Sequence, residues 1–397
     1  MPDKTISILH IASDEKFINA AYYIFEKAFP ECNRFLIPHS RFNRSLKYVK
    51  VQKNMEVVSY RNGLVDYISK VCGKYDCIFL HGITAFNGTV FLASPEKQKF
   101  IGILWGAELY TEENFPERGL KGELTAAIKL PRPEETTTER IKALMRRIVY
   151  GKSPLQKDAT RRAALELSYL CVPYEEEFSL FRERKLISER CRMIPFTYYP
   201  LEYIMKGNEQ SVINGNDILL GNSASYTNNH LEAFQLLRKL NTGKRKIVVP
   251  LSYGNTLYAD YIQSAGKSLF DGNFRPLREF MPLNDYTKEI MSCGIVIMNQ
   301  FRQQAIGNIL TMLWLGSRVY LSEHNTFYHY LKRIGVLVFS VEKDLTTRNT
   351  YSLTNISKSE IEKNRTILRK AIGQDKIIKE LQSEVLNYFQ KSCSVST

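Results

Sequence analysis

Short apolar runs alternate with amphipathic segments along the first half of the chain. Residues 6–11 form a run of strand length, and residues 15–28 carry apolar side chains on one side at helical spacing. Strands that alternate with helices predict a parallel, doubly wound sheet, in which ligands bind at the carboxyl ends of the strands. Further strands are predicted at 34–37, 57–59, 77–81 and 100–105, and a further helix at 64–71.

A second series of the same kind follows a polar stretch at residues 195–215. Because 397 residues are too many for one ordinary core, two α/β domains are expected, residues 1–205 and 206–397. The predicted architecture is two Rossmann-like domains facing a cleft. The second series comprises strands at 217–221, 246–250, 278–280, 294–299 and 318–321, and helices at 230–240, 256–265, 283–292 and 306–315.

The middle of the chain interrupts this alternation of strands and helices. A loop at 131–138, indicated by its Pro and Thr content, precedes a predicted helix at 139–150. Residues 140–162 carry a net charge of +7. A basic amphipathic helix can lie on an anionic membrane surface, and it can equally pack its apolar stripe on a core while the charges face water. Both interpretations stay open for Arg140, Arg146 and Arg147.

Composition narrows the classes of partner. The net charge of +14 favours an anionic partner, which can be nucleic acid, anionic lipid or a diphosphate-bearing ligand. The basic residues are spread along the chain without interleaved aromatic residues, so a nucleic-acid-binding protein is the least favoured class. The seven cysteines contain no C-x-x-C pair, which argues against a zinc site or disulfide framework and fits a reducing cytoplasm. No uncharged apolar window approaches the length of about 18 residues that spans a bilayer.

Small and amide residues gather where predicted strands of the second half end. The strand at 217–221 ends at Gly221 and is followed by Asn222, Ser223 and Asn228. A glycine permits close backbone approach, the other side chains offer hydroxyl and amide groups, and the next helix presents free backbone N–H groups to an anion. The stretch therefore predicts a diphosphate cradle, although an ordinary capped helix start would contain the same residue types.

Arg302 lies in the polar run that follows the predicted strand at 294–299. Its guanidinium could bind diphosphate oxygens bidentately. No D-x-D motif is present, so no metal is expected, and Arg302 and helix N-termini would stabilise the diphosphate charge. Ser252 and Tyr253 follow another strand, and the tyrosine ring could stack on a nucleobase. The other candidate donor-binding residues are Asn299, Gln303, Gln304, Gly307, Asn308, Glu323 and Asn325.

His81 and Glu108 are the candidate bases of the first half, since each lies at or just after the end of a predicted strand. Deprotonating a sugar hydroxyl near neutral pH needs a positioned imidazole or a carboxylate of raised pKa. Both residues are also compatible with a hydrogen-bonded structural role. No nucleophile elbow is present, which argues against a hydrolase.

Several sequence blocks together resemble one known family. They are His-Gly at 81–82, Leu-Trp-Gly-Ala-Glu-Leu-Tyr at 104–110, Leu-Gly-Asn-Ser at 220–223 and Arg-Gln-Gln-Ala-Ile-Gly at 302–307. Their order and spacing resemble the bacterial N-acetylfucosaminyltransferases of enterobacterial common antigen synthesis, glycosyltransferase family 56. The chain departs from the family pattern at 224–226, where Ala-Ser-Tyr replaces Gly-Asp-Arg, and in an insertion around residues 111–138.

The resemblance implies a GT-B fold whose C-terminal domain binds a TDP-sugar. It also implies transfer of a 4-acetamido-4,6-dideoxyhexose (an N-acetylfucosamine-like residue) to an undecaprenyl-diphosphate-linked glycan in surface polysaccharide synthesis. The protein would then work peripherally at the cytoplasmic face of the bacterial inner membrane, with Trp105 and the basic segment toward acceptor and membrane. Another nucleotide sugar, or a soluble acceptor, is the alternative within the same fold. No nucleic-acid partner is expected.

Overall fold

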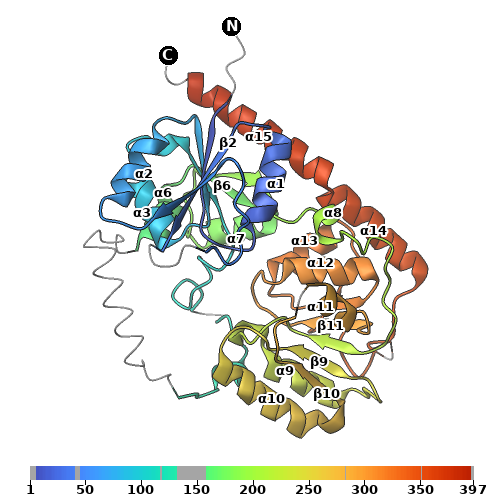
Figure 1. The fold of residues 1–397 in the computed structure, drawn as a ribbon. Helices are drawn as coiled ribbons and strands as arrows, with labels where there is room; N and C mark the ends of the chain where they lie inside the picture. Colours follow the sequence, from blue (N-terminus) through green and yellow to red (C-terminus); the bar gives the residue numbers. More distant parts are fainter. Residues whose placement is uncertain are drawn as a thin grey trace. The chain divides into compact units, whose positions relative to one another are not determined.

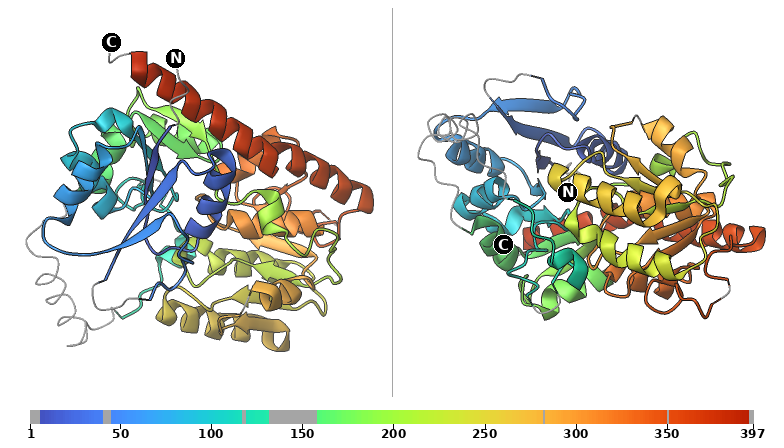
Figure 2. Two further views of the ribbon diagram at one scale, coloured as in Figure 1. Left: turned by 45° about the horizontal axis from the view of Figure 1, so that its top comes forward. Right: turned by 90° about the horizontal axis from the view of Figure 1, so that it is seen from below.

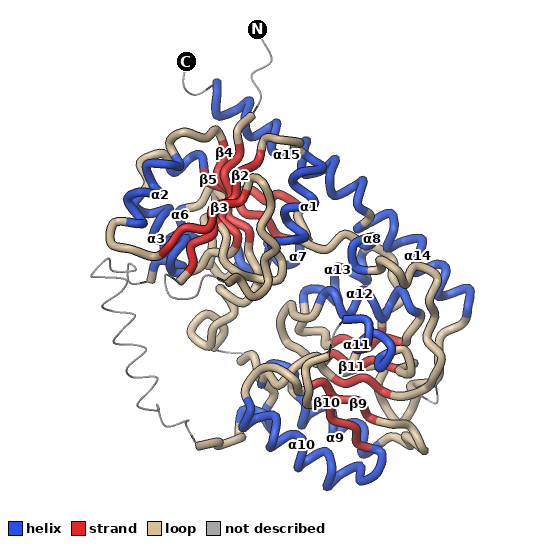
Figure 3. Tube along the Cα trace, viewed as in Figure 1, coloured by secondary structure: helices blue, strands red, loops and turns tan. Residues whose placement is uncertain are grey.

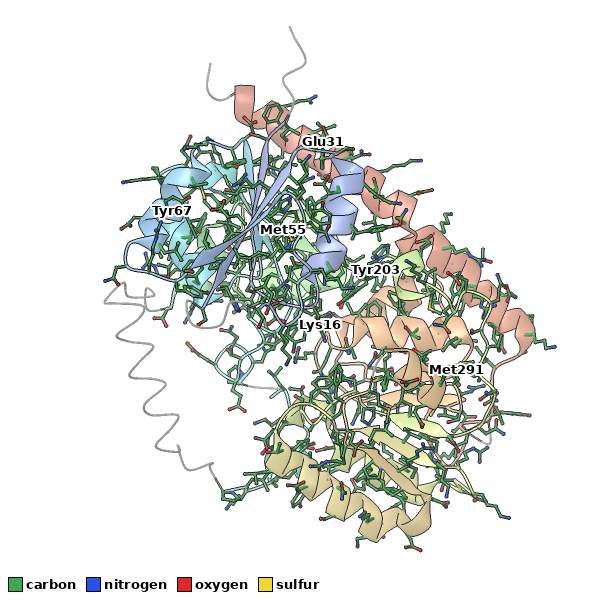
Figure 4. All side chains as sticks on the ribbon, in the orientation of Figure 1. Lys16, Glu31, Met55, Tyr67, Tyr203 and Met291 are labelled. Carbon is green, nitrogen blue, oxygen red and sulfur yellow. The ribbon has the colours of Figure 1, made fainter. Side chains whose placement is uncertain are left out.

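The computed structural model describes residues 6–40, 45–116, 119–131, 158–281, 283–349 and 351–394. The chain forms two compact units, each built on its own parallel β-sheet (Figure 1). The first unit comprises Met1–Leu109, Pro133–Pro200 and Gln374–Thr397, and the second comprises Tyr110–Arg132 and Leu201–Gly373. Side chains fill the space between sheet and helices in each unit (Figure 4).

Within the described residues of the first unit, seven parallel strands follow the order β3-β2-β1-β4-β5-β6-β7. The central strands are fully buried and apolar except for His10 and His81, as expected for a sheet that helices cover on both faces. The predicted doubly wound sheet is confirmed. The strands are β1 (Ile8–Ile11), β2 (Asn33–His39), β3 (Met55–Ser59), β4 (Cys77–His81), β5 (Phe100–Ile103), β6 (Tyr169–Val172) and β7 (Arg192–Pro195).

Helices cover both faces of this sheet, with α2, α3 and α6 on one face and α1 and α15 on the other (Figures 1 and 3). Helix α3 begins with a capped turn, in which Thr84 Oγ1 accepts the N–H of Asn87 over 3.2 Å. The helices are α1 (Ile18–Ala28), α2 (Leu64–Cys72), α3 (Ala85–Ala93), α6 (Ala159–Glu166), α7 (Glu175–Glu183) and α15 (Gln374–Ser394), with a 3₁₀ turn at Lys97–Lys99.

The last helix of the chain, α15, returns to the first unit. Figures 1 and 2 show it (red) beside α1 (blue). Its Ile377, Leu381 and Val385 are buried in the core of that unit, and Gln382 Nε2 donates to Ala28 O over 2.7 Å. The predicted second domain, residues 206–397, is therefore corrected. It loses residues 374–397 because the apolar face of α15 packs on the first sheet, and it gains residues 110–132 and 201–205.

Within the described residues of the second unit, six parallel strands follow the order β10-β9-β8-β11-β12-β13. The strand predicted at 278–280 is wrong. The edge strand lies at Phe274–Leu277, where both terminal side chains are buried, whereas Phe280 is 83% exposed. The strands are β8 (Ile218–Leu220), β9 (Ile247–Pro250), β10 (Phe274–Leu277), β11 (Ile295–Met298), β12 (Arg318–Leu321) and β13 (Phe339–Ser340).

Two groups of helices accompany the second sheet. Helices α9 and α10 pack on each other, as do α8, α12 and α14, and the short α4 packs on α9. The helices are α4 (Glu123–Ala126), α8 (Leu201–Ile204), α9 (His230–Lys239), α10 (Thr256–Phe270), α11 (Leu283–Ile290), α12 (Ile306–Leu315), α13 (Thr326–Arg333) and α14 (Lys358–Ile372), with 3₁₀ turns at Tyr226–Asn228 and Asp271–Asn273. The predicted basic helix at 139–150, with Arg140, Arg146 and Arg147, lies outside the described residues.

Candidate functional site

The carboxyl ends of β4 and β5 bring His81, Gly82 and Trp105 together. His81 pairs in register with Ile103, and the Gly82 N–H donates to Ile103 O over 2.9 Å. Gly82 has a φ of +79°, and a Cβ at this position would lie 2.8 Å from the Trp105 ring. Glycine is therefore required for the indole to pack against this turn. Asn87 Nδ2 fixes the turn by donating to the carbonyl oxygens of His81 and Gly82.

Glu108 folds back onto the start of its own loop. Its Oε1 accepts the N–H of Trp105 over 3.0 Å and the N–H of Ile83 over 3.2 Å, and its Oε2 lies 3.1 Å from the same Trp105 nitrogen. Burial raises the pKa of this carboxyl group, and the N–H donors oppose the rise without cancelling it. The carboxylate is thus held in a fixed position, and its pKa is closer to neutral pH than that of an ordinary glutamate. Both properties suit a general base.

A buried chain of hydrogen bonds runs from Trp105 through two histidines to Asn33. Trp105 Nε1 donates to the Tyr198 hydroxyl over 3.2 Å, and this hydroxyl lies 3.1 Å from His81 Nδ1. His81 Nε2 lies 2.9 Å from His10 Nδ1, and His10 Nε2 lies 3.1 Å from Asn33 Oδ1. The Asn33 amide group donates in turn to two carbonyl groups at the end of α1. Hydrogen bonds therefore connect the Trp105 indole to buried residues of the first sheet.

The Asn33 side-chain oxygen determines which atom donates and which accepts in each of these hydrogen bonds. Because Oδ1 can only accept, His10 carries its proton on Nε2, His10 Nδ1 accepts from His81 Nε2, and His81 Nδ1 accepts from Tyr198. Burial lowers the pKa of His10 to about 3 and also lowers the pKa of His81 well below its usual value. Both rings are consequently neutral near pH 7.

His81 is completely buried, and both of its ring nitrogens are occupied. A substrate hydroxyl cannot reach it in this arrangement, so the geometry opposes the predicted role of His81 as the base. In the structure His81 instead links Tyr198 to His10. Sequence reasoning missed His10, Asn33 and Tyr198, and the one available signal was a histidine within the apolar run at 6–11.

The second sheet has its topological switch point between β8 and β11. The first strand of this unit, β8, lies between β9 and β11, so the strand order reverses there. Doubly wound sheets bind ligands in the crevice outside the carboxyl ends of the strands at such a point. The two loops that follow these strands, residues 221–229 and 299–305, contain most of the predicted donor-binding residues.

Asn228 closes the loop after β8 into a compact turn. Its Oδ1 accepts the Asn222 N–H over 3.1 Å, and its Nδ2 donates to Ser223 O over 2.9 Å. Gly221 has a φ of +67°, and a Cβ there would lie 2.9 Å from Asn228 Oδ1. The four predicted residues of this loop therefore form one turn, which requires glycine at its first position.

Two glutamines from the loop after β11 reach this turn. Gln300 Nε2 donates to Asn228 Oδ1 over 2.8 Å, and Gln304 Nε2 donates to Asn222 Oδ1 over 2.9 Å. Gln300 is fully buried, and its Oε1 has no partner among the described residues. A buried acceptor without a donor is rare in folded proteins and is often completed by water or a ligand. Gln300 was not among the predicted site residues, although its position directly after a buried strand was a signal.

Asn299 also joins the two loops, through its carbonyl oxygen and its side-chain amide. Asn229 Nδ2 donates to Asn299 O over 2.9 Å, and Asn299 Nδ2 donates back to Asn229 O over 3.4 Å. Asn229 has a φ of +51° and directly precedes α9, a left-handed position that asparagine tolerates better than most residues. The loops after β8 and β11 are thus joined both at the turn and at the start of α9.

Helix α12 begins without a side-chain cap. Ala305 precedes it with a φ of +59°, a conformation that is uncommon for a residue with a Cβ and that concentrates at functional sites. Backbone N–H groups of the first turn, at Gly307 and Asn308, have no intrahelical acceptor and carry partial positive charge. A Cβ at Gly307 would meet no atom within 4 Å, so the space beside this turn is open. In the preceding loop, Arg302 Nη1 donates to Gln303 O over 3.0 Å.

Tyr253 extends from the loop after β9 toward the same turn. Its side chain is 49% exposed, and Asn222 Nδ2 donates to its hydroxyl over 2.8 Å. The Ala224 N–H donates to Tyr253 O over 2.8 Å, which holds the loop beside residues 221–228. Ser252 precedes it in the same loop. An exposed ring with a fixed hydroxyl is suited to stacking on a flat ligand.

The loop after β12 gives its two predicted residues different roles. Glu323 Oε2 pairs with Lys343 Nζ over 2.8 Å, so its charge is already compensated. Asn325 Oδ1 caps α13 by accepting the Phe327 N–H over 3.0 Å. Asn325 is fully buried, and its Nδ2 has no partner among the described residues. Asn325 therefore keeps a donor group without a partner among the described residues, whereas the Glu323 carboxylate is already engaged in an ion pair.

The described residues contain no group of three or more His, Cys, Asp or Glu placed to hold a metal ion. In that same part of the chain, every helix is too short or too polar to cross a membrane. The six cysteines that the structure describes are free thiols, and burial raises the pKa of Cys77 and Cys171.

Several solved structures match this fold along nearly the whole chain. HepE from Anabaena, in complex with UDP and glucose, aligns over 96% of this chain and 99% of its own with a TM-score of 0.61 and 11% identity. Sucrose-phosphate synthase from Thermosynechococcus elongatus aligns over 97% and 100% with a TM-score of 0.60 and 8% identity. A structure described as trehalose-6-phosphate from E. coli bound with UDP-2-fluoro glucose aligns over 97% and 99% with a TM-score of 0.58 and 12% identity. At these identities the likeness shows the fold, which is GT-B.

Two Rossmann-like sheets, with polar loops at the carboxyl ends of their strands, form the GT-B fold, and the predicted fold class is confirmed. Residues 181–370 match the 4-alpha-L-fucosyltransferase family, glycosyl transferase group 56. This match confirms the resemblance seen in the sequence blocks, and the chain is a glycosyltransferase. The matched segment contains the loops after β8, β9, β11 and β12, and therefore the whole candidate donor site.

Proposed function

We propose that this chain transfers a 4-acetamido-4,6-dideoxyhexose from a TDP-sugar to an undecaprenyl-diphosphate-linked glycan. One observation carries the proposal: two amide-rich loops are joined at the switch point of the second sheet, beside Arg302 and the open first turn of α12. The match to a fucosyltransferase family supports a 6-deoxyhexose as the transferred sugar. The complex of HepE with UDP and glucose supports a nucleotide-sugar donor on this fold.

The donor occupies the second unit in this proposal. Its diphosphate binds Arg302 and the N–H groups at the start of α12, because a helix N-terminus and a guanidinium both favour an anion. The Tyr253 ring stacks on the base. The buried Gln300 Oε1 and Asn325 Nδ2 offer one acceptor and one donor to ligand hydroxyl groups, which would complete their hydrogen bonding.

Glu108 serves as the base in the transfer step. Its carboxylate takes the proton of the acceptor hydroxyl, the acceptor oxygen forms a bond to C1 of the sugar, and the bond from C1 to the diphosphate oxygen breaks. The nucleoside diphosphate leaves with the electrons of that bond. Arg302 and α12 stabilise the added negative charge, and we propose that no metal is needed for this.

A lipid-linked acceptor at the cytoplasmic face of the inner membrane completes the proposal. The net charge of +14 favours both an anionic membrane surface and a diphosphate-bearing acceptor. Trp105, which lies beside Glu108 in sequence and contacts Phe17 and Tyr198, is the proposed wall for the acceptor sugar. Binding to the membrane is peripheral in this account.

A transfer assay with two acceptors tests the function. Labelled TDP-, UDP- and GDP-sugars are offered to membranes that supply undecaprenyl-linked glycans, and in parallel to the same glycan in water-soluble form. Transfer from a TDP-sugar to the lipid-linked acceptor is expected. Transfer to the soluble glycan alone would remove the membrane part of the proposal, and transfer from no nucleotide sugar would overturn it.

A further inference from the structure

The segment that was predicted to be an insertion, around residues 111–138, begins on the second unit. The chain leaves the first unit between Leu109 and Tyr110, two residues after Glu108. The described residues that follow, 110–116 and 119–131, are called the strap here. The strap contacts the rest of the second unit near its start and near its end. Both contacts involve the candidate donor loops.

The first contact joins Tyr110 to Arg302. The Arg302 guanidinium carbon lies 5.9 Å from the centre of the Tyr110 ring, at the outer range of a cation–π contact. Tyr110 is buried, and the Phe115 ring stacks on it with centres 4.8 Å apart. Arginine has a long side chain with several rotatable bonds, so a fixed ring beside the guanidinium limits the positions it can occupy.

The second contact joins the strap to the start of α9. The Gly122 N–H donates to Asn229 Oδ1 over 2.8 Å, and Asn229 Nδ2 donates to Asn299 O in the loop after β11. Thr125 donates through its N–H to Glu232 Oε1 over 2.8 Å and through its hydroxyl to Glu232 Oε2 over 2.5 Å. A Cβ at Gly122 would lie 2.3 Å from Glu232 Oε1, so a larger residue here would displace the Glu232 side chain from this position.

Apolar and cationic contacts support the same arrangement. Ile128 and Leu130 pack against the core of the second unit, and Lys121 Nζ lies 5.4 Å from the centre of the Tyr226 ring. The strap is therefore part of the packed structure of this unit. Because Tyr226 lies in the loop after β8 and Arg302 lies in the loop after β11, the contacts of the strap reach both candidate donor loops.

We infer that the strap positions the donor-binding loops, with Tyr110 orienting Arg302 and with Gly122 and Thr125 fixing the start of α9. The inference rests on the proposed role of Arg302 in binding the donor diphosphate. Tyr110 is a positioning residue, because it acts through the guanidinium rather than on the donor. Nucleotide affinity in this chain therefore depends on a segment outside the two loops themselves.

Calorimetric titration of TDP into four proteins tests the role of Tyr110. The wild type is compared with Tyr110→Leu, which removes the ring, with Tyr110→Phe, which keeps it, and with Tyr261→Leu, which removes an exposed tyrosine from α10 of the same unit. Tyr110→Leu is expected to raise the Kd for TDP about three- to tenfold, the range of a partly exposed to buried cation–π contact. Tyr110→Phe and Tyr261→Leu are expected to bind as the wild type does.

A double-mutant cycle separates orientation from a general structural effect. In the Arg302→Ala background, Tyr110→Leu is expected to leave the Kd for TDP unchanged, because no guanidinium remains to be oriented. An equal loss in both backgrounds, or wild-type affinity of Tyr110→Leu, would overturn the inference. If the wild type itself bound none of TDP, UDP and GDP, the proposed function would fail together with the inference.

A second pair of variants serves if Tyr110→Leu does not fold. Thr125→Val loses the hydroxyl that donates to Glu232, and Thr125→Ser keeps it. Weaker TDP binding by Thr125→Val than by Thr125→Ser supports the strap as a positioning element. Equal binding by the two variants and the wild type would contradict it, while the donor site itself would stand.

Discussion

Replacing Glu108 by Gln removes the charge of the proposed base and keeps the shape of the side chain. The Gln oxygen can still accept the N–H groups of Trp105 and Ile83, which lie 3.0 and 3.2 Å from Oε1 of the glutamate. The new Nε2 cannot accept, so the longer branch to the Trp105 nitrogen is lost. The loop after β5 is expected to keep its position while the side chain loses the ability to take a proton.

The expected loss in turnover follows from that change. General base catalysis contributes about 10²- to 10⁴-fold, so kcat is expected to fall by such a factor, or about 3–5.5 kcal/mol in barrier height. Nucleotide affinity is expected to change less than about twofold. The reason is that Glu108 belongs to the first unit, whereas Arg302 and both donor loops belong to the second.

The same substitution tests the raised pKa through protein stability. Because the pKa of Glu108 is raised above its ordinary 4.5, its stabilising contribution is present below pH 4.5 and is lost as the pH rises through the raised value. Ionisation at pH 7 therefore costs stability, and a rise of one pKa unit corresponds to about 1.4 kcal/mol. Glu108→Gln is expected to unfold at higher urea concentration than the wild type at pH 7, and the difference should shrink at pH 4.

The assay compares kcat at saturating substrates, the Kd of TDP by calorimetry, and urea unfolding at both pH values. Glu189→Gln, which changes an exposed glutamate of the same unit, is the matched control and should behave as the wild type. Wild-type turnover by Glu108→Gln would refute the role of Glu108 as the base. A large loss of TDP affinity would instead assign Glu108 to donor binding.

Three further changes have expected outcomes. Arg302→Ala should weaken TDP binding about 10- to 150-fold, the loss of a charge-assisted bond of about 1.5–3 kcal/mol, and equal calorimetric affinity would contradict its donor role. Gly221→Ala places a Cβ 2.9 Å from Asn228 Oδ1 at a φ of +67°, so it should lower the free energy of unfolding by about 1–3 kcal/mol, and an unchanged urea midpoint would count against the tight turn. Burial lowers the pKa of His10 and His230 to about 3, so the stability from their neutral forms is present above pH 6.5 and is lost as the pH falls toward 3. His230→Asn should flatten the dependence of the urea midpoint on pH below 6.5, and an unchanged slope would refute that assignment.

The strands buried on both faces were the most predictable part of the fold. Runs such as those of β4, β11 and β12 are apolar except for a terminal His81 or Arg318 and have the length of strands, so pattern alone locates them. Helix α12 was predicted at its observed bounds because turn residues flank its apolar stretch. The edge strand β10 was misplaced, because its four residues include an arginine and a proline and lack a periodic signal.

Contacts between distant parts of the chain escaped prediction. The place of α15 depends on its packing against the first sheet, and Tyr388, for example, donates to Gln98 O over 2.6 Å. The sequence indicates the strap only as an insertion, because no local sequence pattern shows that Thr125 binds Glu232. Each of these relations joins residues that are separated by about a hundred positions or more.

The candidate site was predictable where a strand end marks it. Glycines and amides at strand ends identified the turn around Gly221, since a doubly wound sheet brings such ends together. Burial distinguishes the two candidate bases. His81 and Glu108 looked equivalent in the sequence, and the structure shows a sealed imidazole and a carboxylate of raised pKa. The two His81 ring nitrogens are occupied by His10 and Tyr198, and Tyr198 lies far along the chain and meets His81 only in the fold.

Transfer of a labelled 4-acetamido-4,6-dideoxyhexose from its TDP-sugar to an undecaprenyl-linked glycan tests the central claim most directly. The wild type is predicted to form labelled lipid, and Arg302→Ala and Glu108→Gln are each predicted to lose most of that activity under the same conditions. Label in the lipid fraction that is independent of both residues, or no label with any TDP-, UDP- or GDP-sugar, would contradict the account.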